Sequence, residues 1–286
     1  MAKGVLVDIP KCIGCGSCTV ACKLWNQVGF DERYPSSGKE AVLSDKNWTI
    51  VVSCEVVDKE NRPAWRFTKQ QCLHCQQPAC VSACFSKALQ KNSDGAVVYY
   101  PHLCVGCRYC MVACPFDIPR YEWDKTFPLV TKCQMCSTRI SQGEAPVCVL
   151  VCPTGAIEFD ERDSLLKKAH AKIHKDSTYT RSIYGEKEVG GTGWLYISDV
   201  AFDKLGFKTN LGSDSLPIYS HNYLKYIPGI AVIWGMLLTG LYYYGKRKKD
   251  LLTKNRESEI SSTDKKREKE VVSRKNSSRK SKDEHN

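Results

Sequence analysis

The 286-residue sequence lacks the usual marks of an enzyme active site. No nucleophile–base pair stands out, and the glycine-rich stretch at residues 188–193 lacks the preceding strand and following helix of a phosphate-binding loop. Residues 1–8 contain neither the apolar run nor the twin arginine of an export signal. We therefore expect no substrate chemistry in this chain. If its body lies outside the cytoplasm, we expect a partner with an export signal to carry it there.

Apolar residues and charges are unevenly distributed. Hydrophobic residues make up 42% of the chain and the mean hydropathy is −0.36, which excludes both a polytopic membrane protein and a wholly disordered chain. The formal net charge is +11, and residues 245–286 hold 15 Lys or Arg against 8 Asp or Glu. The body before this tail is only mildly basic, so we expect no nucleic-acid partner.

One charge-free run, residues 226–245, is long enough to cross a membrane. At about 1.5 Å per residue a helix of this length spans about 30 Å, the thickness of the hydrocarbon core. Tyrosines flank both ends of the run. We therefore expect a transmembrane helix here rather than a buried helix of a soluble protein. Residues 246–265 carry seven Lys or Arg and residues 206–225 carry two, so the positive-inside rule predicts a cytoplasmic tail and a body on the other side.

The segments on either side of this run differ from each other. Residues 161–225 contain no cysteine and are expected to form a connector. It begins with a helix over 161–175 and continues through a loop to a strand at Trp194–Ile197. One face of that helix would carry Leu165, Leu166, Ala169 and Ile173. The tail, residues 246–286, has too few apolar residues to fold and is predicted to be disordered.

All 17 cysteines lie in the first 160 residues, and sixteen of them form four sets. The first set has the spacing C-x2-C-x2-C-x3-C, the third repeats it, and the second and fourth have wider middle gaps. The sets are Cys12, Cys15, Cys18 and Cys22; Cys72, Cys75, Cys80 and Cys84; Cys104, Cys107, Cys110 and Cys114; and Cys133, Cys136, Cys148 and Cys152. Cys54 stands alone, and we expect it to be a small buried side chain rather than a redox thiol.

This spacing is typical of [4Fe–4S] clusters. Three thiolates at two-residue gaps can wrap three corners of an iron–sulfur cube, while the fourth cysteine, often followed by proline, binds a neighbouring cluster. Zinc usually takes two well-separated C-x2-C pairs, and disulfide geometry is hard to satisfy within such short gaps. The sequence therefore predicts four [4Fe–4S] clusters. His74 lies inside the second set, where four cysteines already suffice, so we expect it beside a cluster or facing solvent.

The cysteine segments resemble a known family. The motifs are K-C-I-G-C at residues 11–15, C-R-Y-C-M-V-A-C-P at 107–115 and V-C-P-T-G-A-I at 151–157. They are similar to those of the iron–sulfur (beta) electron-transfer subunit of membrane-bound formate dehydrogenases and other respiratory molybdoenzymes. Residues 184–192 and the membrane run also resemble that subunit and the beta-type partner of periplasmic nickel–iron hydrogenases.

The resemblance implies which cysteines share a cluster, because in that family the first set pairs with the fourth and the second with the third. Carried over, the ligand sets are Cys12, Cys15, Cys18 and Cys152; Cys133, Cys136, Cys148 and Cys22; Cys72, Cys75, Cys80 and Cys114; and Cys104, Cys107, Cys110 and Cys84. The expected fold is α+β, with two intertwined bacterial-ferredoxin-like units and one C-terminal transmembrane helix. The outer unit would comprise residues 1–68 with 129–160, and the inserted unit residues 69–128.

The resemblance also implies a function. The chain would not be an enzyme by itself but would relay electrons from a catalytic subunit, whose molybdenum or tungsten pterin centre oxidises formate, to a membrane cytochrome b and quinone. Alternatives are the same relay for a nickel–iron hydrogenase, and the reverse direction for a polysulfide or dimethyl sulfoxide reductase. A zinc-binding interaction protein with a nucleic-acid-binding tail is the alternative from another class. We expect a single-pass protein of the cell membrane with its body on the periplasmic side.

Overall fold

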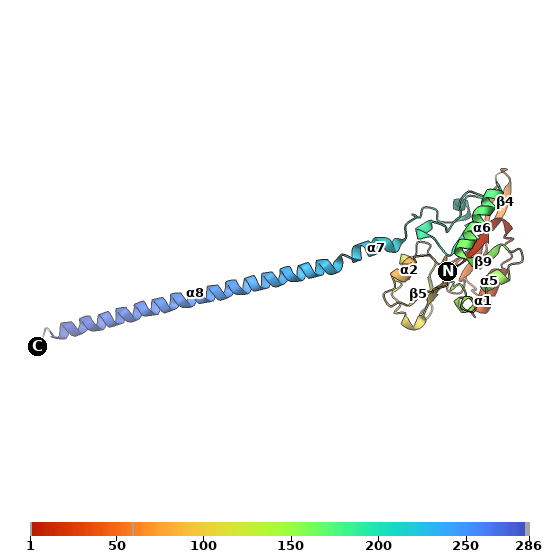
Figure 1. Ribbon diagram of the computed structural model, residues 1–286. Helices are drawn as coiled ribbons and strands as arrows, with labels where there is room; N and C mark the ends of the chain where they lie inside the picture. Colours follow the sequence, from red (N-terminus) through yellow and green to blue (C-terminus); the bar gives the residue numbers. More distant parts are fainter. Residues whose placement is uncertain (1, 59, 284–286) are drawn as a thin grey trace. The chain divides into compact units, whose positions relative to one another are not determined.

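A computed structural model describes residues 2–58 and 60–283 of the protein (Figure 1). The chain divides into two units, Met1–His221 and Asn222–Asn286. All 17 cysteines belong to the first unit. Any site built from them is therefore a property of that unit alone.

The first unit is built on a three-stranded sheet with the order β10-β1-β9. β1 (Lys3–Asp8) runs parallel to β10 (Trp194–Ile197) and antiparallel to β9 (Ile157–Glu161). The strand predicted at residues 194–197 is confirmed, and its side chains are fully buried. Because successive strand residues face opposite sides, this sheet presents one apolar face to each of two cores.

One face of the sheet is covered by α6 (Arg162–Lys175), which lies along it in Figure 1. Leu165, Ala169 and Ile173 of this helix are buried against Leu6 of β1, while Leu166 is only partly buried at the edge. The helix predicted over residues 161–175 and its apolar face are confirmed. The 3.6-residue periodicity of its apolar residues was enough to predict this helix, because a single face of the helix packs on the sheet.

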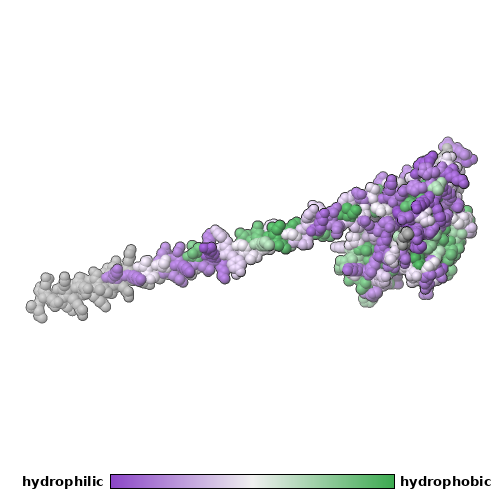
Figure 2. Space-filling view, in the orientation of Figure 1, coloured by the Kyte–Doolittle hydropathy of each residue, from purple (hydrophilic) through white to green (hydrophobic). Residues whose placement is uncertain are grey.

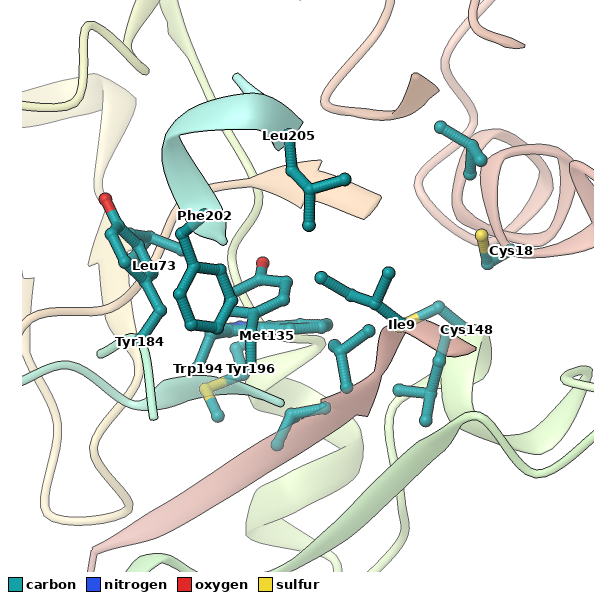
Figure 3. Packing of buried hydrophobic residues seen from close by; sticks show 14 of the residues in the cluster. Ile9, Cys18, Leu73, Met135, Cys148, Tyr184, Trp194, Tyr196, Phe202 and Leu205 are labelled. Carbon is teal, nitrogen blue, oxygen red and sulfur yellow. The ribbon is translucent and has the colours of Figure 1, made fainter. Parts of the chain in front are cut away.

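The other face of the sheet carries the main core (Figure 3). Trp194, Tyr196 and Leu205 are fully buried in it. Cys18 and Cys148, which come from the first and fourth cysteine sets, belong to the same cluster of side chains. The packing that stabilises the sheet therefore also positions cysteines from both ends of the cysteine-rich region.

A second sheet, which the sequence did not predict, has the order β2-β3-β4. Its strands are β2 (Ser37–Gly38), β3 (Thr49–Val57) and β4 (Pro63–Gln71), and β3 pairs with β4 in antiparallel register along its whole length. Near the end of β4 the polar side chains of Lys69 and Gln71 are buried. β4 thus delivers buried polar groups directly before the second cysteine set.

The other elements of the first unit are short. They are α1 (Ser17–Trp25), α2 (Ala79–Ser82), α3 (Tyr109–Ala113), α4 (Ser137–Ser141), α5 (Val147–Leu150), the strand pairs β5 (Leu89–Lys91) with β6 (Val97–Tyr99) and β7 (Arg120–Tyr121) with β8 (Val130–Thr131), and the 3-10 turns η1 (Ile9–Lys11), η2 (Pro101–Leu103), η3 (Glu188–Gly190) and η4 (Phe202–Leu205). A smaller core within residues 80–130 joins β5, β6 and β8. The mixture of helix and sheet confirms the predicted α+β class.

The predicted division of the cysteine-rich region stays a prediction. Residues 80–130 have their own small core, as expected of an inserted unit. However, Ala96 and Val98 pack in the main core with Val5 and Val7. The proposed inserted and outer units therefore share apolar packing across their boundary.

Beyond η4, the structure contains α7 (Leu216–Leu224) and α8 (Ile227–Asp283). By length and composition, the helical stretch Leu216–Thr263 is apolar enough to cross a membrane, which confirms the predicted long apolar helix. Figure 2 shows this apolar stretch followed by a hydrophilic one. The hydrophilic part continues as helix to Asp283, whereas the composition predicts a disordered tail. Lys, Arg and Glu favour helix locally, although an unpacked helix is only marginally stable in water.

Candidate metal centres

The first and third cysteine sets have the same local structure. Each follows a proline-containing 3-10 turn, η1 or η2. In both, the backbone N–H of the first cysteine donates to the carbonyl of the first residue of the turn at 3.0 Å. The third cysteine of each set, Cys18 or Cys110, is buried on the short helix α1 or α3. The sequence repeat is thus a structural repeat.

Glycine is required between the first two cysteines of these sets. Gly14 has φ +70° and Gly106 has φ +71°, a left-handed conformation that side chains disfavour. A Cβ at Gly14 would lie 2.4 Å from the ring of Phe67. Because Phe67 belongs to β4, this close approach also fixes the first cysteine loop against the second sheet.

The second and fourth sets share a different local structure. Each follows a strand, β4 or β8, and each has a left-handed residue before its second cysteine, His74 at φ +49° or Met135 at φ +56°. The third cysteine lies on a four-residue helix preceded by a proline, Pro78 before α2 and Pro146 before α5. The chain therefore alternates two loop types, one after a 3-10 turn and one after a strand.

Two cavities are each lined by four cysteines drawn from the first and fourth sets. The first has an empty volume of about 400 Å³, part of it open to solvent, and the second about 340 Å³. Group 1, around the first cavity, is Cys12, Cys15, Cys18 and Cys152. Group 2, around the second, is Cys22, Cys133, Cys136 and Cys148. In both groups three cysteines come from one set and one from the other.

The remaining eight cysteines are brought together in two further groups, as their mutual electrostatic effects indicate. Burial raises the pKa of Cys75 and Cys80, and the thiols of Cys72 and Cys114 raise the pKa of both further. Burial also raises the pKa of Cys110 to about 11, with contributions from Cys84, Cys104 and Cys107. We name Cys72, Cys75, Cys80 and Cys114 group 3, and Cys84, Cys104, Cys107 and Cys110 group 4. Cys72 and Cys114 pack in one side-chain cluster, and Cys84, Cys104 and Cys110 pack in another.

Shared packing links neighbouring groups. Cys18 of group 1 and Cys148 of group 2 both belong to the main core. Cys72 of group 3 packs in one cluster with Cys133 of group 2. Cys80 of group 3 and Cys110 of group 4 belong to the smaller core within residues 80–130. The groups therefore follow one another in space in the order 1, 2, 3, 4, which the sequence did not reveal.

The donor set fits iron–sulfur clusters. Sixteen thiols stand in four groups of four, the ligand set of a [4Fe–4S] cluster. Burial raises the pKa of Cys133 and of Cys148 to about 11. Among the side chains that the structure describes, no three from His, Cys, Asp or Glu are close enough to share a single metal ion. A cube spaces its ligands further apart than one zinc ion, whose sulfurs would stand about 3.8 Å apart.

Two residues singled out from the sequence lie outside the four groups. His74 is fully buried, which excludes the solvent-facing alternative and leaves a place beside a cluster. Its Nδ1 accepts a hydrogen bond from the Val97 N–H at 2.8 Å, which ties the second cysteine loop to β6. Cys54 is half-buried on β3 and packs against the main core.

Two functional candidates, Lys69 and Trp194, were not found from the sequence. Lys69 lines both the group 1 and the group 2 cavity, and Trp194 lines the group 2 cavity. Lysine in a strand is normally exposed, so residue type gave no signal for Lys69. Trp194 lies in a predicted strand, but only the three-dimensional fold brings that strand to the cysteines.

Comparison with known proteins identifies the family. A family model described as a 4Fe-4S dicluster domain matches residues 63–162. A protein of Nitratidesulfovibrio vulgaris (strain Hildenborough), whose name assigns no function, is 42% identical over 255 residues, 87% of this chain and 68% of that protein. The Hydrogenase-2 operon protein HybA of Escherichia coli O157:H7 is 32% identical over 239 residues, 71% of each chain. The nitrate-inducible formate dehydrogenase iron-sulfur subunit of Escherichia coli K12 is 37% identical over 199 residues, 67% of this chain and 66% of that subunit.

The chain therefore belongs to the family of iron–sulfur electron-transfer subunits that includes these hydrogenase and formate dehydrogenase proteins. The resemblance seen in the sequence is confirmed, as is a dicluster, ferredoxin-like domain. The matched region contains the second, third and fourth cysteine sets complete. This membership favours iron–sulfur clusters over zinc as the partners of the sixteen cysteines.

Proposed function

We propose that the chain holds four [4Fe–4S] clusters, one in each group, and relays electrons along them. The order of the groups is the observation that carries this proposal, because cysteines of groups 1 and 2, of groups 2 and 3, and of groups 3 and 4 share packed side-chain clusters. The two exposed cysteines are Cys15 in group 1 and Cys107 in group 4, at the two ends. A line of redox centres with accessible ends and a protected middle suits a relay between two partners.

The ligands of each cluster are the four cysteines of its group. The clusters supply one-electron redox chemistry, and the chain holds them in order and keeps water from the middle of the line. Groups 1 and 2 belong to an outer ferredoxin-like unit, residues 1–68 with 129–160. Groups 3 and 4 belong to an inserted unit, residues 69–128. The shared core supports this intertwined arrangement, because side chains of both units pack together in it.

Both ends of the line present apolar side chains for partner subunits. Ile13, between Cys12 and Cys15, is exposed, and so is Val105 at the equivalent position between Cys104 and Cys107. Exposed apolar side chains beside a redox centre favour a protein contact there, because burial of that surface is favourable. One end would receive electrons and the other would deliver them.

The electron donor is a catalytic subunit with a molybdenum or tungsten pterin centre that oxidises formate, and the acceptor is a membrane cytochrome b that passes electrons to quinone. Support comes from relatives named as formate dehydrogenase iron-sulfur subunits. The second candidate is the same relay for a nickel–iron hydrogenase, supported by HybA, which matches 71% of this chain.

Purification of the tagged full-length chain from membranes in mild detergent separates these two functions. We expect a large subunit containing a molybdenum or tungsten pterin to co-purify, and formate to reduce the clusters of the complex. Co-purification of a nickel-containing large subunit, with reduction by hydrogen instead, would establish the second candidate. A chain that emerges without any redox partner from its native membrane would contradict both.

The body is proposed to lie on the periplasmic side and the tail in the cytoplasm, because the tail side carries seven Lys or Arg against two within twenty residues of the apolar run. We expect protease added to spheroplasts to digest the body, Met1–His221, and to spare a tag at the C-terminus. Lysed cells serve as the control, because there the tag must also be digested. Protection of the body in intact spheroplasts would reverse the proposed orientation.

A further inference from the structure

Lys69 is a buried cation between groups 1 and 2. It is not a cluster ligand, so binding of the clusters by the cysteines does not explain its position. Its side chain is 2% exposed and lines both cavities. Its Nζ donates hydrogen bonds to Thr49 Oγ1 and, at 3.1 Å, to Gln71 Oε1. Both acceptors are neutral, so neither compensates the positive charge. A buried charge without a counter-charge is strongly unfavourable, so a negative group must stand nearby when the protein is loaded.

The negative groups that act most strongly on Lys69 are the cysteines themselves. Burial lowers the pKa of the Lys69 ammonium, but thiols of groups 1 and 2, led by Cys18 and Cys148, raise it to a value above the ordinary one. Lys69 in turn lowers the pKa of Cys18 and of Cys148. Because the Lys69 side chain lines both cavities, a single ammonium reaches cysteines of both groups.

Trp194 adds a second unused donor at the same place. Its side chain is fully buried and lines the group 2 cavity. Among the residues that the structure describes, its indole Nε1 has no hydrogen-bond partner. The Lys69 Nζ lies 5.1 Å from the centre of the Trp194 ring, a cation–π contact that holds the ammonium beside the indole. A buried N–H without an acceptor is costly, so an acceptor at the cavity is expected.

We propose that Lys69 is a shared electrostatic partner of the clusters in groups 1 and 2, and that the Trp194 Nε1–H donates a hydrogen bond to a sulfur of group 2. This inference rests on the proposed function. One-electron reduction adds one negative charge to a cluster, and a fixed cation or N–H donor beside it favours the more negative state. Lys69 therefore raises the reduction potentials of both clusters, and Trp194 raises that of group 2.

Lys132 provides a matched control, because it is a second buried lysine at a different group. It is 3% exposed and lowers the pKa of Cys80 in group 3. Its Nζ donates to the Cys133 carbonyl at 3.0 Å. Lys132 lies next to Cys133 of group 2 in sequence, so a change at Lys132 can also affect group 2. The signal of group 1 therefore distinguishes the two lysines, because a change at Lys132 should leave it unaltered.

The test is a redox titration, followed by electron paramagnetic resonance, of the anaerobically purified full-length chain. In Lys69→Met we expect the one-electron reduction of groups 1 and 2 to become at least tenfold less favourable, a shift of about 59 mV to lower potential. Trp194→Phe keeps an aromatic ring but lacks the N–H donor, and it should lower the reduction potential of group 2 only, by less than Lys69→Met does. Lys132→Met should leave group 1 unchanged and lower group 3.

The outcomes separate this inference from the proposed function. A full complement of about sixteen irons with unchanged potentials in Lys69→Met would overturn the inference alone, whereas absent clusters in the wild-type chain would overturn the proposed function. If Lys69→Met loses iron, Lys69→Gln and Lys69→Arg decide. Loss of groups 1 and 2 from Lys69→Gln with retention in Lys69→Arg supports a requirement for charge, and loss from both contradicts it.

Discussion

Removal of iron is expected to abolish the cooperative unfolding transition of the body. Groups 1 to 4 place sixteen thiols inside a unit of 221 residues, and Cys18, Cys148 and Lys69 lie at or beside its main core. Structural metal sites contribute on the order of 10 kcal/mol to folding, comparable with the whole stability of a domain. Without clusters, the buried Lys69 ammonium would also lose the anions that compensate it. The free energy of unfolding of the body should therefore fall to about zero.

The measurement is a thermal scan with near-ultraviolet circular dichroism before and after treatment with chelator and oxidant. Rebuilding the clusters with iron and sulfide under reducing conditions should restore the transition, which controls for chemical damage. An iron-free chain that still melts cooperatively within a few degrees of the loaded protein would contradict this prediction.

Substitution of single ligands should remove clusters by group rather than by sequence set. We expect Cys12→Ser and Cys152→Ser to alter the same paramagnetic signal, although 140 residues separate them. Cys22→Ser should alter a different signal, although Cys22 follows Cys18 by only four residues. The reason is the placement of Cys12 and Cys152 at one cavity and of Cys22 at the other. Each full loss should also lower the iron content by about four.

Cys54→Ser is the matched control for these variants, because Cys54 is the one cysteine outside the four groups. It should keep all four signals and the full iron content. If Cys22→Ser and Cys12→Ser instead abolish one and the same signal, each sequence set binds its own cluster and the interleaved grouping is incorrect.

Local chemistry in this protein could be predicted from the sequence, and long-range placement could not. The ligand type follows from thiol spacing because three of the four ligands of each cluster lie in one loop. The helix at 162–175 and the strand at 194–197 also follow from their periodicity and composition. The meeting of Cys152 with Cys12 was suggested only by family resemblance, because no local pattern encodes which distant loop completes a cavity.

The β3–β4 hairpin and Lys69 illustrate what the sequence conceals. β4 ends in four consecutive polar residues, Thr68–Gln71, as an exposed strand would, yet Lys69 and Gln71 are buried there. Their burial depends on the cysteine cavities on either side, which are built from chain segments far from β4. A polar residue whose partner is a metal centre cannot be distinguished from a surface residue by its type.

Iron and acid-labile sulfide content of the anaerobically isolated full-length chain tests the central claim most directly. The grouping of sixteen cysteines predicts about sixteen irons and sixteen sulfides per chain, a brown colour, and paramagnetic signals on reduction with dithionite. A colourless protein that contains zinc, no acid-labile sulfide and no signal on reduction would contradict the account.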